Sequence, residues 1–153
     1  MISKLPIGLY VSAAAAVVSI GLAFAGPADD AITARKNCMK AGHGGVMAVA
    51  VPMMKGAVPY DAAALKVAYD ADGAACADWS KWWGDDTQKG ETIKTRAAPE
   101  IWTDAAGFEA AGGAFYAAAL KLQAATDEAS FKAAFPAFGA GCQGCHEKFR
   151  SAE

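Results

Sequence analysis

The sequence lacks any run or stripe of basic residues, and its charges nearly balance. Lysine and arginine total 14, aspartate and glutamate total 16, and the formal net charge is −2. Because a nucleic-acid-binding surface needs clustered positive charge, we expect no nucleic-acid partner. β-Branched residues are sparse beside abundant alanine, and this balance favours helix over strand.

Long apolar runs are also lacking, except for one at the N-terminus. Lys4 precedes an apolar stretch of about 16 residues, shorter than the roughly 20 that a membrane-spanning helix needs. Residues 23–25 then read Ala-Phe-Ala, which matches a signal-peptidase cleavage site. We therefore expect residues 1–25 to be a secretory signal peptide cleaved after Ala25. The mature protein would be one domain, residues 26–153, in the periplasm or an equivalent exported compartment, without a membrane anchor.

Apolar residues recur at helical spacing over four segments of the mature chain. Aspartates able to cap a helix N-terminus stand at or near the starts of the first three, at Asp29 or Asp30, Asp61 and Asp104, and Thr126-Asp127 begins the fourth. We expect helices over residues 30–54, 61–83, 104–125 and 126–150, with a short helical turn at 99–102. Four amphipathic helices with short connections predict an all-α fold, an antiparallel four-helix bundle.

Three glycines, Gly42, Gly44 and Gly45, interrupt the first of these helices. Each costs about 1 kcal/mol relative to alanine inside a helix, so their presence needs a reason. One reason is a flat ligand that passes close to the backbone. The other is a kink or a break in the helix.

Histidine is scarce, with two in the chain, and there are four cysteines. Residues 142–146 read Cys-Gln-Gly-Cys-His, which is the attachment motif of haem c. On a helix, two cysteines three residues apart lie on one face, where each can form a thioether with one vinyl group of a haem. The histidine that follows can ligate the iron. The motif therefore predicts one covalently bound haem c, attached through Cys142 and Cys145, with His146 as an iron ligand.

Two other uses of these cysteines are less consistent with the sequence. A thioredoxin-like dithiol is expected near a βαβ pattern, and none is visible. A zinc site needs two further ligands, and the chain offers only a scattered supply: Cys38, His43 and Cys76.

The mature chain as a whole resembles the class II c-type cytochromes, the cytochrome c′ family. The resemblance rests on four stretches: residues 35–40 (Arg-Lys-Asn-Cys-Met-Lys), 55–63 (Lys-Gly-Ala-Val-Pro-Tyr-Asp-Ala-Ala), 98–102 (Ala-Pro-Glu-Ile-Trp) and 141–150 around the haem motif. It implies that Arg35 pairs with a haem propionate and that Met39 faces the distal side of the iron. It also implies that Arg150 is the basic residue one turn after the proximal histidine.

The family has two branches, which differ at the sixth coordination site of the iron. In one branch a methionine of the first helix ligates the iron, and the protein carries single electrons between redox partner proteins. In the other, five-coordinate iron in an apolar pocket binds nitric oxide or carbon monoxide. Met39-Lys40, Gly44-Gly45 and Met47 resemble the first branch more, apart from an apparent extra residue around His43. We expect Met39 to ligate the iron of a one-electron carrier, with a gas-binding cytochrome c′ as the alternative.

His43 is a third candidate for the sixth site, because it lies one helical turn after Met39. An enzyme is not expected, since no distal Arg/His pair is evident to assist peroxide cleavage and His43 is the only candidate acid–base group. Members of the family often form homodimers through their first two helices, but the sequence does not reveal the oligomeric state.

Cys38 and Cys76 are not needed for haem attachment. The turn between the first two helices centres near residue 57, so the two cysteines lie at equal distances from it and at the same height of an antiparallel hairpin. In an oxidising compartment they could form a disulfide between the helices. Two buried, unpaired thiols are the alternative, and the sequence leaves both open.

Overall fold

The structure is a computed structural model that describes residues 26–152. The predicted signal peptide, residues 1–25, lies outside them.

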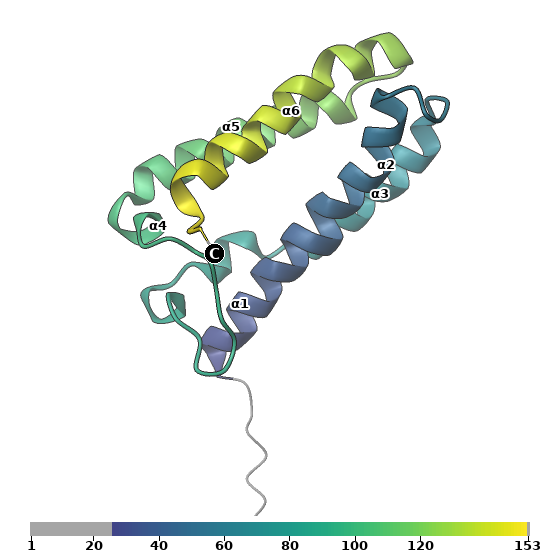
Figure 1. Cartoon of the computed structure of the whole chain (residues 1–153). Helices are drawn as coiled ribbons and strands as arrows, with labels where there is room; N and C mark the ends of the chain where they lie inside the picture. The colour runs from purple at the N-terminus through teal and green to yellow at the C-terminus, as the bar shows by residue number, and fades with distance from the viewer. Residues whose placement is uncertain (1–25, 153) are drawn as a thin grey trace, which may run out of the picture.

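Four long helical segments form two antiparallel hairpins (Figure 1). Their bounds are α1 (Pro27–Asn37), η1 (Cys38–His43) and α2 (Gly44–Met54), which together make the first segment, then α3 (Ala62–Cys76), α5 (Ala105–Gln123) and α6 (Glu128–Phe149). Three short helices lie in the connection from α3 to α5: η2 (Trp79–Trp82), η3 (Asp85–Thr87) and α4 (Glu100–Thr103). The predicted all-α four-helix bundle is confirmed, and none of the described helices is long and apolar enough to cross a membrane.

The predicted aspartate caps at Asp61 and Asp104 are present, and Asp127, where the fourth helix was expected to begin, is also a cap. The Asp61 carboxylate accepts hydrogen bonds from two backbone N–H groups at the start of α3, each at 2.9 Å. Asp104 accepts from Gly107 at the start of α5, and Asp127 forms a capping box with Ser130 at the start of α6. These side chains satisfy backbone donors that the first helical turn leaves without partners.

The second helix is shorter than predicted, ending at Cys76 rather than near residue 83. The chain beyond it turns to meet the connection that follows. The carbonyl of Trp82 accepts from the Thr87 hydroxyl at 2.9 Å, and that of Trp83 accepts from the Trp102 indole at 3.0 Å. These hydrogen bonds tie the segment after Cys76 to the connection that leads to α5.

The first helix does not break at its glycines. Its backbone instead widens into a π-helix over η1 (Cys38–His43) and then continues as α2. A π-helical turn accommodates one additional residue inside an α-helix, which agrees with the extra residue noted around His43. A Cβ atom at Gly42 would lie 2.6 Å from Asp72 Oδ1 and 3.1 Å from Cys76 Sγ. Gly42 therefore allows α3 to approach closely, and neither the flat-ligand explanation nor a helix break accounts for it.

The close approach of η1 and α3 is where the two remaining cysteines meet. Cys38 and Cys76 form a disulfide, with their Cα atoms 4.9 Å apart. The disulfide alternative left open by the sequence is confirmed. It closes a loop spanning 38 residues, and constraining a loop of this length in the unfolded chain stabilises a protein by about 3–4 kcal/mol.

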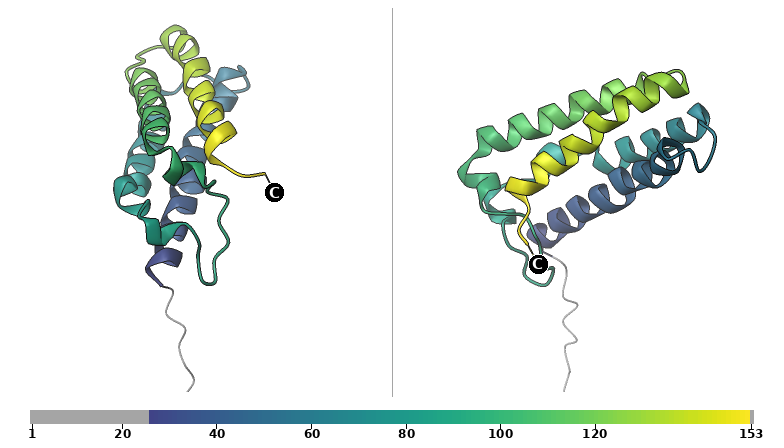
Figure 2. Two further views of the ribbon diagram at one scale, coloured as in Figure 1. Left: turned by 90° about the vertical axis from the view of Figure 1, so that its left-hand side faces the viewer. Right: turned by 45° about the horizontal axis from the view of Figure 1, so that its top comes forward.

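The main apolar core lies at one end of the bundle. It contains side chains of all four segments: Val46, Ala50, Met53, Leu65, Ala119, Leu122, Phe131 and Phe138. At this end the α2–α3 and α5–α6 turns lie close together, and the two hairpins diverge toward the other end (Figures 1 and 2). The core thus joins the two hairpins at the end of the bundle away from the haem motif. The hairpins lie apart at the end that contains the motif.

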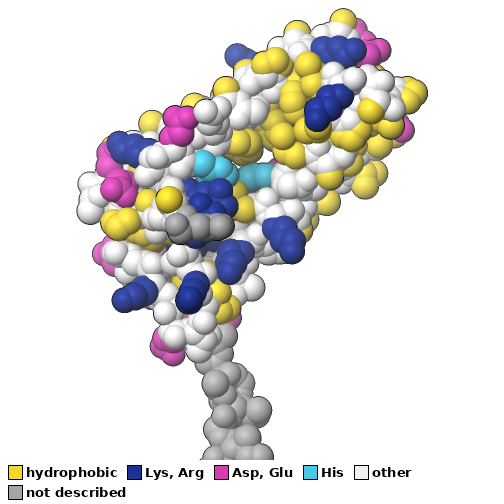
Figure 3. Space-filling model, viewed as in Figure 1, with side chains coloured by type: hydrophobic (Ala, Val, Ile, Leu, Met, Phe, Trp, Pro, Cys, Tyr) yellow, Lys and Arg dark blue, Asp and Glu magenta, His cyan; other side chains and the backbone are white. Residues whose placement is uncertain are grey.

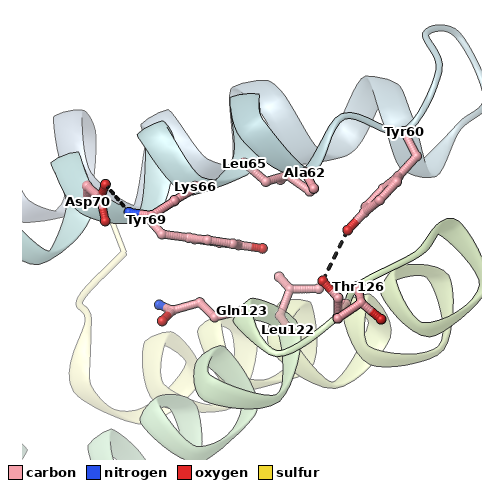
Figure 4. Close-up of a pocket in the computed structure, with 10 residues that line it drawn as sticks. Tyr60, Ala62, Leu65, Lys66, Tyr69, Asp70, Leu122, Gln123 and Thr126 are labelled. Carbon is pink, nitrogen blue, oxygen red and sulfur yellow. Dashed lines mark hydrogen bonds and ion pairs between the residues drawn. The ribbon is translucent and has the colours of Figure 1, made fainter.

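A pocket of about 540 Å³ opens beside this core, between α3 and the end of α5 (Figure 4). The Tyr69 hydroxyl is buried there without a hydrogen-bond partner among the described residues, and burial raises the pKa of Tyr69 to about 12. The Tyr60 hydroxyl donates to the Ala125 carbonyl at 3.1 Å. None of the residues predicted to bind a cofactor lines this pocket.

Asp29 anchors the connection between α3 and α5 to the first helix. It was a candidate cap of that helix, but this prediction was wrong, because Gly26 occupies the cap position. The Asp29 side chain is buried and accepts from the backbone N–H groups of Thr92 at 3.0 Å and Ile93 at 3.2 Å. The Thr92 hydroxyl, followed by these backbone donors, lowers the pKa of Asp29, although burial acts in the opposite direction.

The Asp29 anchor predicts a specific loss of stability in acid. Because its folded-state pKa lies below its unfolded value, the contribution is complete above the unfolded pKa of about 3.9 and disappears as pH falls through the folded-state pKa. Asp29→Asn should lower the free energy of unfolding at pH 7 and flatten its decline below pH ~4. Denaturant unfolding at several pH values measures both effects, with the exposed Asp30→Asn as control. Equal pH profiles for the two variants would contradict this role.

Gly42 lies just before the last residue of the π-helix, and Gly45 lies shortly after it. We expect alanine substitutions at these two positions to have opposite effects on stability. Gly42→Ala should destabilise the protein by about 1–3 kcal/mol, because the added methyl group collides with α3. Gly45→Ala should be neutral or stabilising by up to about 1 kcal/mol, because nothing lies within 4 Å and alanine favours helix. Thermal and denaturant unfolding of both variants tests whether Gly42 is required for the close approach of α3. Equal changes in stability for the two variants would contradict this role.

Candidate haem-binding site

The haem motif lies in the last two turns of α6. Its three reactive side chains, Cys142, Cys145 and His146, are each half-buried, whereas the intervening Gln143 and Gly144 are exposed. Both cysteines are free thiols, and burial raises the pKa of each. The helix therefore presents the motif toward the interior with its thiols unpaired, as attachment of a haem through two thioethers requires.

The surroundings of His146 favour its uncharged form, which is the form that binds iron, because they lower its pKa. Burial is the main cause that lowers its pKa, followed by the positive charges of Arg150, His43 and Arg96. A neutral imidazole keeps a nitrogen lone pair available for a metal. Both histidines of the chain line a hollow between the two hairpins, with lysine and arginine side chains beside it (Figure 3).

η1, in the first hairpin, bears the two candidates for the sixth ligand, Met39 and His43. Met39 is half-buried. His43 is fixed on two sides: its Nδ1 atom lies 2.7 Å from Asp72 Oδ1, and its ring centroid lies 4.8 Å from that of Phe115. The structure thus places both candidates for the sixth ligand on one π-helical turn, and His43 contacts Phe115 of α5, in the hairpin that carries His146.

Arg35, the predicted propionate partner, is buried and only partly satisfied. Its Nη2 group donates to the Thr87 carbonyl at 2.6 Å, and its Nε group donates to the Ala31 carbonyl at 3.3 Å. Its guanidinium carbon lies 4.7 Å from the centroid of the Trp83 ring. The Nη1 group is buried and has no partner among the described residues, and the same is true of Trp83 Nε1.

These two buried donors without acceptors allow a test of whether a haem fits the site. A buried donor without an acceptor costs about 1–3 kcal/mol, and a propionate would satisfy it with a charge-assisted hydrogen bond. The site therefore combines two thiols, a neutral imidazole and a buried cation with a free donor, which is the set that haem c needs. The residues present fit the group.

Arg150 stands at the rim of the site. Its backbone pairs with Ala97 of the α3–α5 connection, and its side chain is exposed. It is near enough to His146 to lower that residue's pKa. The structure places it where the family resemblance predicts a basic residue, but no contact assigns it a propionate.

Asp72 is the residue of this site that the sequence analysis missed. A signal was present: the hairpin register that places Cys38 opposite Cys76 places His43 opposite residue 71, beside Asp72. Trp83 was missed as a partner of Arg35 for a different reason. The contact depends on the fold of the long α3–α5 connection, which has no periodic pattern to read.

Comparison with known proteins agrees with this geometry. The family described as "Cytochrome C'" matches residues 30–150. A cytochrome c' of Rubrivivax gelatinosus is 41% identical over 130 residues, which cover 79% of this chain and 94% of the relative. A cytochrome c' of Alcaligenes xylosoxydans xylosoxydans is 37% identical over 133 residues, covering 83% of this chain and 97% of the relative. A solved nitric oxide complex of a mutant of cytochrome c prime from Alcaligenes xylosoxidans superposes with a TM-score of 0.71 at 32% identity, covering 84% of this chain and 99% of that one.

The unpaired donor of Arg35 predicts an electrostatic effect on a bound haem. Arg35→Gln should lower the midpoint potential by tens of millivolts, because a buried positive charge near the haem stabilises its reduced, more negative state. Redox titration of the haem-loaded protein measures the shift. Lys36→Gln, on the exposed side of the same helix, should leave the potential nearly unchanged. Similar midpoint potentials for the two variants would show that Arg35 does not lie near the haem.

Proposed function

Because the chain belongs to the cytochrome c′ family, we propose that it is an exported one-electron carrier with one haem c. Membership of the family implies a covalently bound haem c with iron. The haem, when bound, accepts and releases one electron at its iron. Redox partner proteins would supply and remove that electron.

The role of each residue in this proposal follows from its place in the site. Cys142 and Cys145 hold the haem covalently, and His146 ligates the iron from the α6 side. Met39 supplies the sixth ligand from η1, and Met/His ligation raises the potential of a haem. Arg35 neutralises a buried propionate through its orphan Nη1 group. The single observation that supports the proposal is the half-buried Cys-X-X-Cys-His motif on α6, together with a half-buried Met39 on η1.

The proposal includes no catalytic turnover. A peroxidase-type enzyme needs a distal Arg/His pair to assist peroxide cleavage, and the sequence shows no such pair. Export to the periplasm rests on the signal peptide predicted for residues 1–25. A homodimer through the first helical hairpin is consistent with the family and is part of the same proposal.

A second candidate function is the binding of a diatomic gas. It is favoured by one observation, the nitric oxide complexes among the similar solved structures of cytochrome c prime. In this case Met39 would cover the iron without ligating it, and the sixth site would open to nitric oxide or carbon monoxide.

The optical spectrum of the purified haem protein distinguishes the two functions. Ligation by Met39 predicts a low-spin spectrum that carbon monoxide leaves unchanged, and Met39→Ala should convert it to a high-spin, gas-binding form. An open site predicts a high-spin spectrum that shifts with carbon monoxide, and Met39→Ala should change the spin state little. Mass spectrometry of the same sample should show one haem and cleavage after Ala25. A mass equal to the polypeptide alone, after expression in a host that assembles cytochrome c, would refute both functions.

A further inference from the structure

We propose that the Cys38–Cys76 disulfide is a second redox centre, reducible by dithiols, in which His43 donates a proton to Cys38. Asp72 would be the residue that positions His43. The co-reactant belongs to the chemical class of dithiols, either small molecules or protein dithiols. This two-electron centre would lie beside the haem site, and it does not depend on the function proposed for the haem.

The π-helical turn aligns the side chains of Cys38 and His43. Cys38 is the first residue of η1 and His43 is the last. Residues five apart are rotated by about 140° in an α-helix, whereas the wider π turn brings them over one another. His43 Nε2 accordingly lies 3.8 Å from Cys38 Sγ. The extra residue of the first helix thus has a specific result, an imidazole nitrogen directed at one sulfur of the disulfide.

Asp72 fixes which nitrogen faces the sulfur. Its Oδ1 atom lies 2.7 Å from His43 Nδ1, and the two side chains are 15% and 19% exposed. Because Nδ1 donates to this carboxylate, Nε2 is left facing Cys38, and the carboxylate is a counter-ion when the imidazole carries two protons. The Phe115 ring, 4.8 Å away between centroids, prevents the imidazole from swinging out of this position. Sulfur, imidazole and carboxylate therefore form a continuous row.

The burial of the two sulfurs makes the disulfide asymmetric. Cys38 is fully buried, with 0% exposure, whereas Cys76 is half-buried. Of the two residues, Cys76 is therefore the more accessible to an incoming thiolate, and Cys38 would be the leaving group. Stabilising the leaving sulfur speeds thiol–disulfide exchange, and Cys38 is the sulfur that His43 contacts.

The reaction balances in two steps. A thiolate of the dithiol forms a bond to Cys76 Sγ, the Cys38–Cys76 bond breaks, and its electron pair goes to Cys38 Sγ, which takes the proton from His43 Nε2. The second thiolate of the dithiol then bonds to the first sulfur of its own molecule, and Cys76 Sγ leaves with the electron pair and takes a proton from water. The dithiol is oxidised to a disulfide, and the two cysteines are reduced. Asp72 Oδ1, 3.5 Å from Cys76 Sγ, can then accept a hydrogen bond from the new thiol.

The test is the rate of reduction of this disulfide in the folded haem protein. The protein is incubated with excess dithiothreitol near neutral pH, and samples are quenched with an alkylating reagent. Peptide mass spectrometry then counts the labels at Cys38 and Cys76, so the absorbance of the haem does not enter the measurement. The variants are His43→Gln, Asp72→Asn and a matched control, Asp70→Asn, which changes an exposed aspartate on the same helix.

His43→Gln should slow reduction about tenfold or more, since a positioned proton donor typically contributes at least that much. Asp72→Asn should slow it less, and Asp70→Asn should leave it unchanged. All four proteins should be reduced at one rate in guanidinium, where the positioned imidazole is absent. If His43→Gln does not fold, the rate of disulfide reduction in Asp72→Asn, compared with that in Asp70→Asn, provides the test.

A purely structural role for His43 predicts the opposite sign, because loosening the contact between η1 and α3 would expose the sulfurs and speed reduction. Equal or faster reduction of the folded His43→Gln variant would therefore overturn the proposal. So would a wild-type protein in which the disulfide is reduced only on global unfolding. Neither result bears on haem binding, because the haem spectrum and mass are read separately.

Discussion

The buried cluster around Phe131 and Phe138 is the interaction on which the rest of the structure depends. It joins the two hairpins at the end that contains the interhelical turns. Burial of a large apolar side chain stabilises a fold by about 1.5–3 kcal/mol, so a few such residues at one end can hold the bundle together. The opposite end is then free to diverge, and there the packing is replaced by a hollow lined by both histidines (Figure 3). A flat prosthetic group fits such a bundle without cutting through its main core.

The divergent end is secured by an aromatic cluster that includes Trp79, Trp83, Phe108 and Phe149, and by polar contacts. The long connection between α3 and α5 is tied to α1 through Asp29 and through Arg35, whose guanidinium donates to the Thr87 carbonyl. The same connection pairs with the end of α6, where the backbone N–H of Ala98 donates to the Phe149 carbonyl at 3.1 Å. Arg35 is therefore rigid before any cofactor contact is made. A preorganised cation costs little entropy when it pairs with a propionate.

Local and periodic features of this fold could be predicted from the sequence, whereas long-range polar contacts could not. The caps at Asp61, Asp104 and Asp127 act within three residues of themselves, so the chain alone reveals them. The cap assigned to Asp29 failed, because its partners lie more than 60 residues away in a segment without periodicity. For the site, the motif on α6 and Arg35 were predicted, but Asp72 was not. The same hairpin register places His43 close to Asp72, but no pairing chemistry in the sequence marks an aspartate as the partner of a histidine, as it does for two cysteines.

The π-helical turn connects the two halves of the site. Cys38 and Met39 are neighbours on η1, and consecutive helical residues are rotated by roughly 80–100°. Cys38 is bound to α3 through Cys76, so Met39 cannot also face α3, and its direction is set by the disulfide beside it. Gly42 lets α3 approach, the disulfide fixes the approach, and His43 stays between Cys38 and Asp72. A change in the bond between Cys38 and Cys76 would therefore be transmitted by one residue to the side chain that we expect on the distal side of the iron.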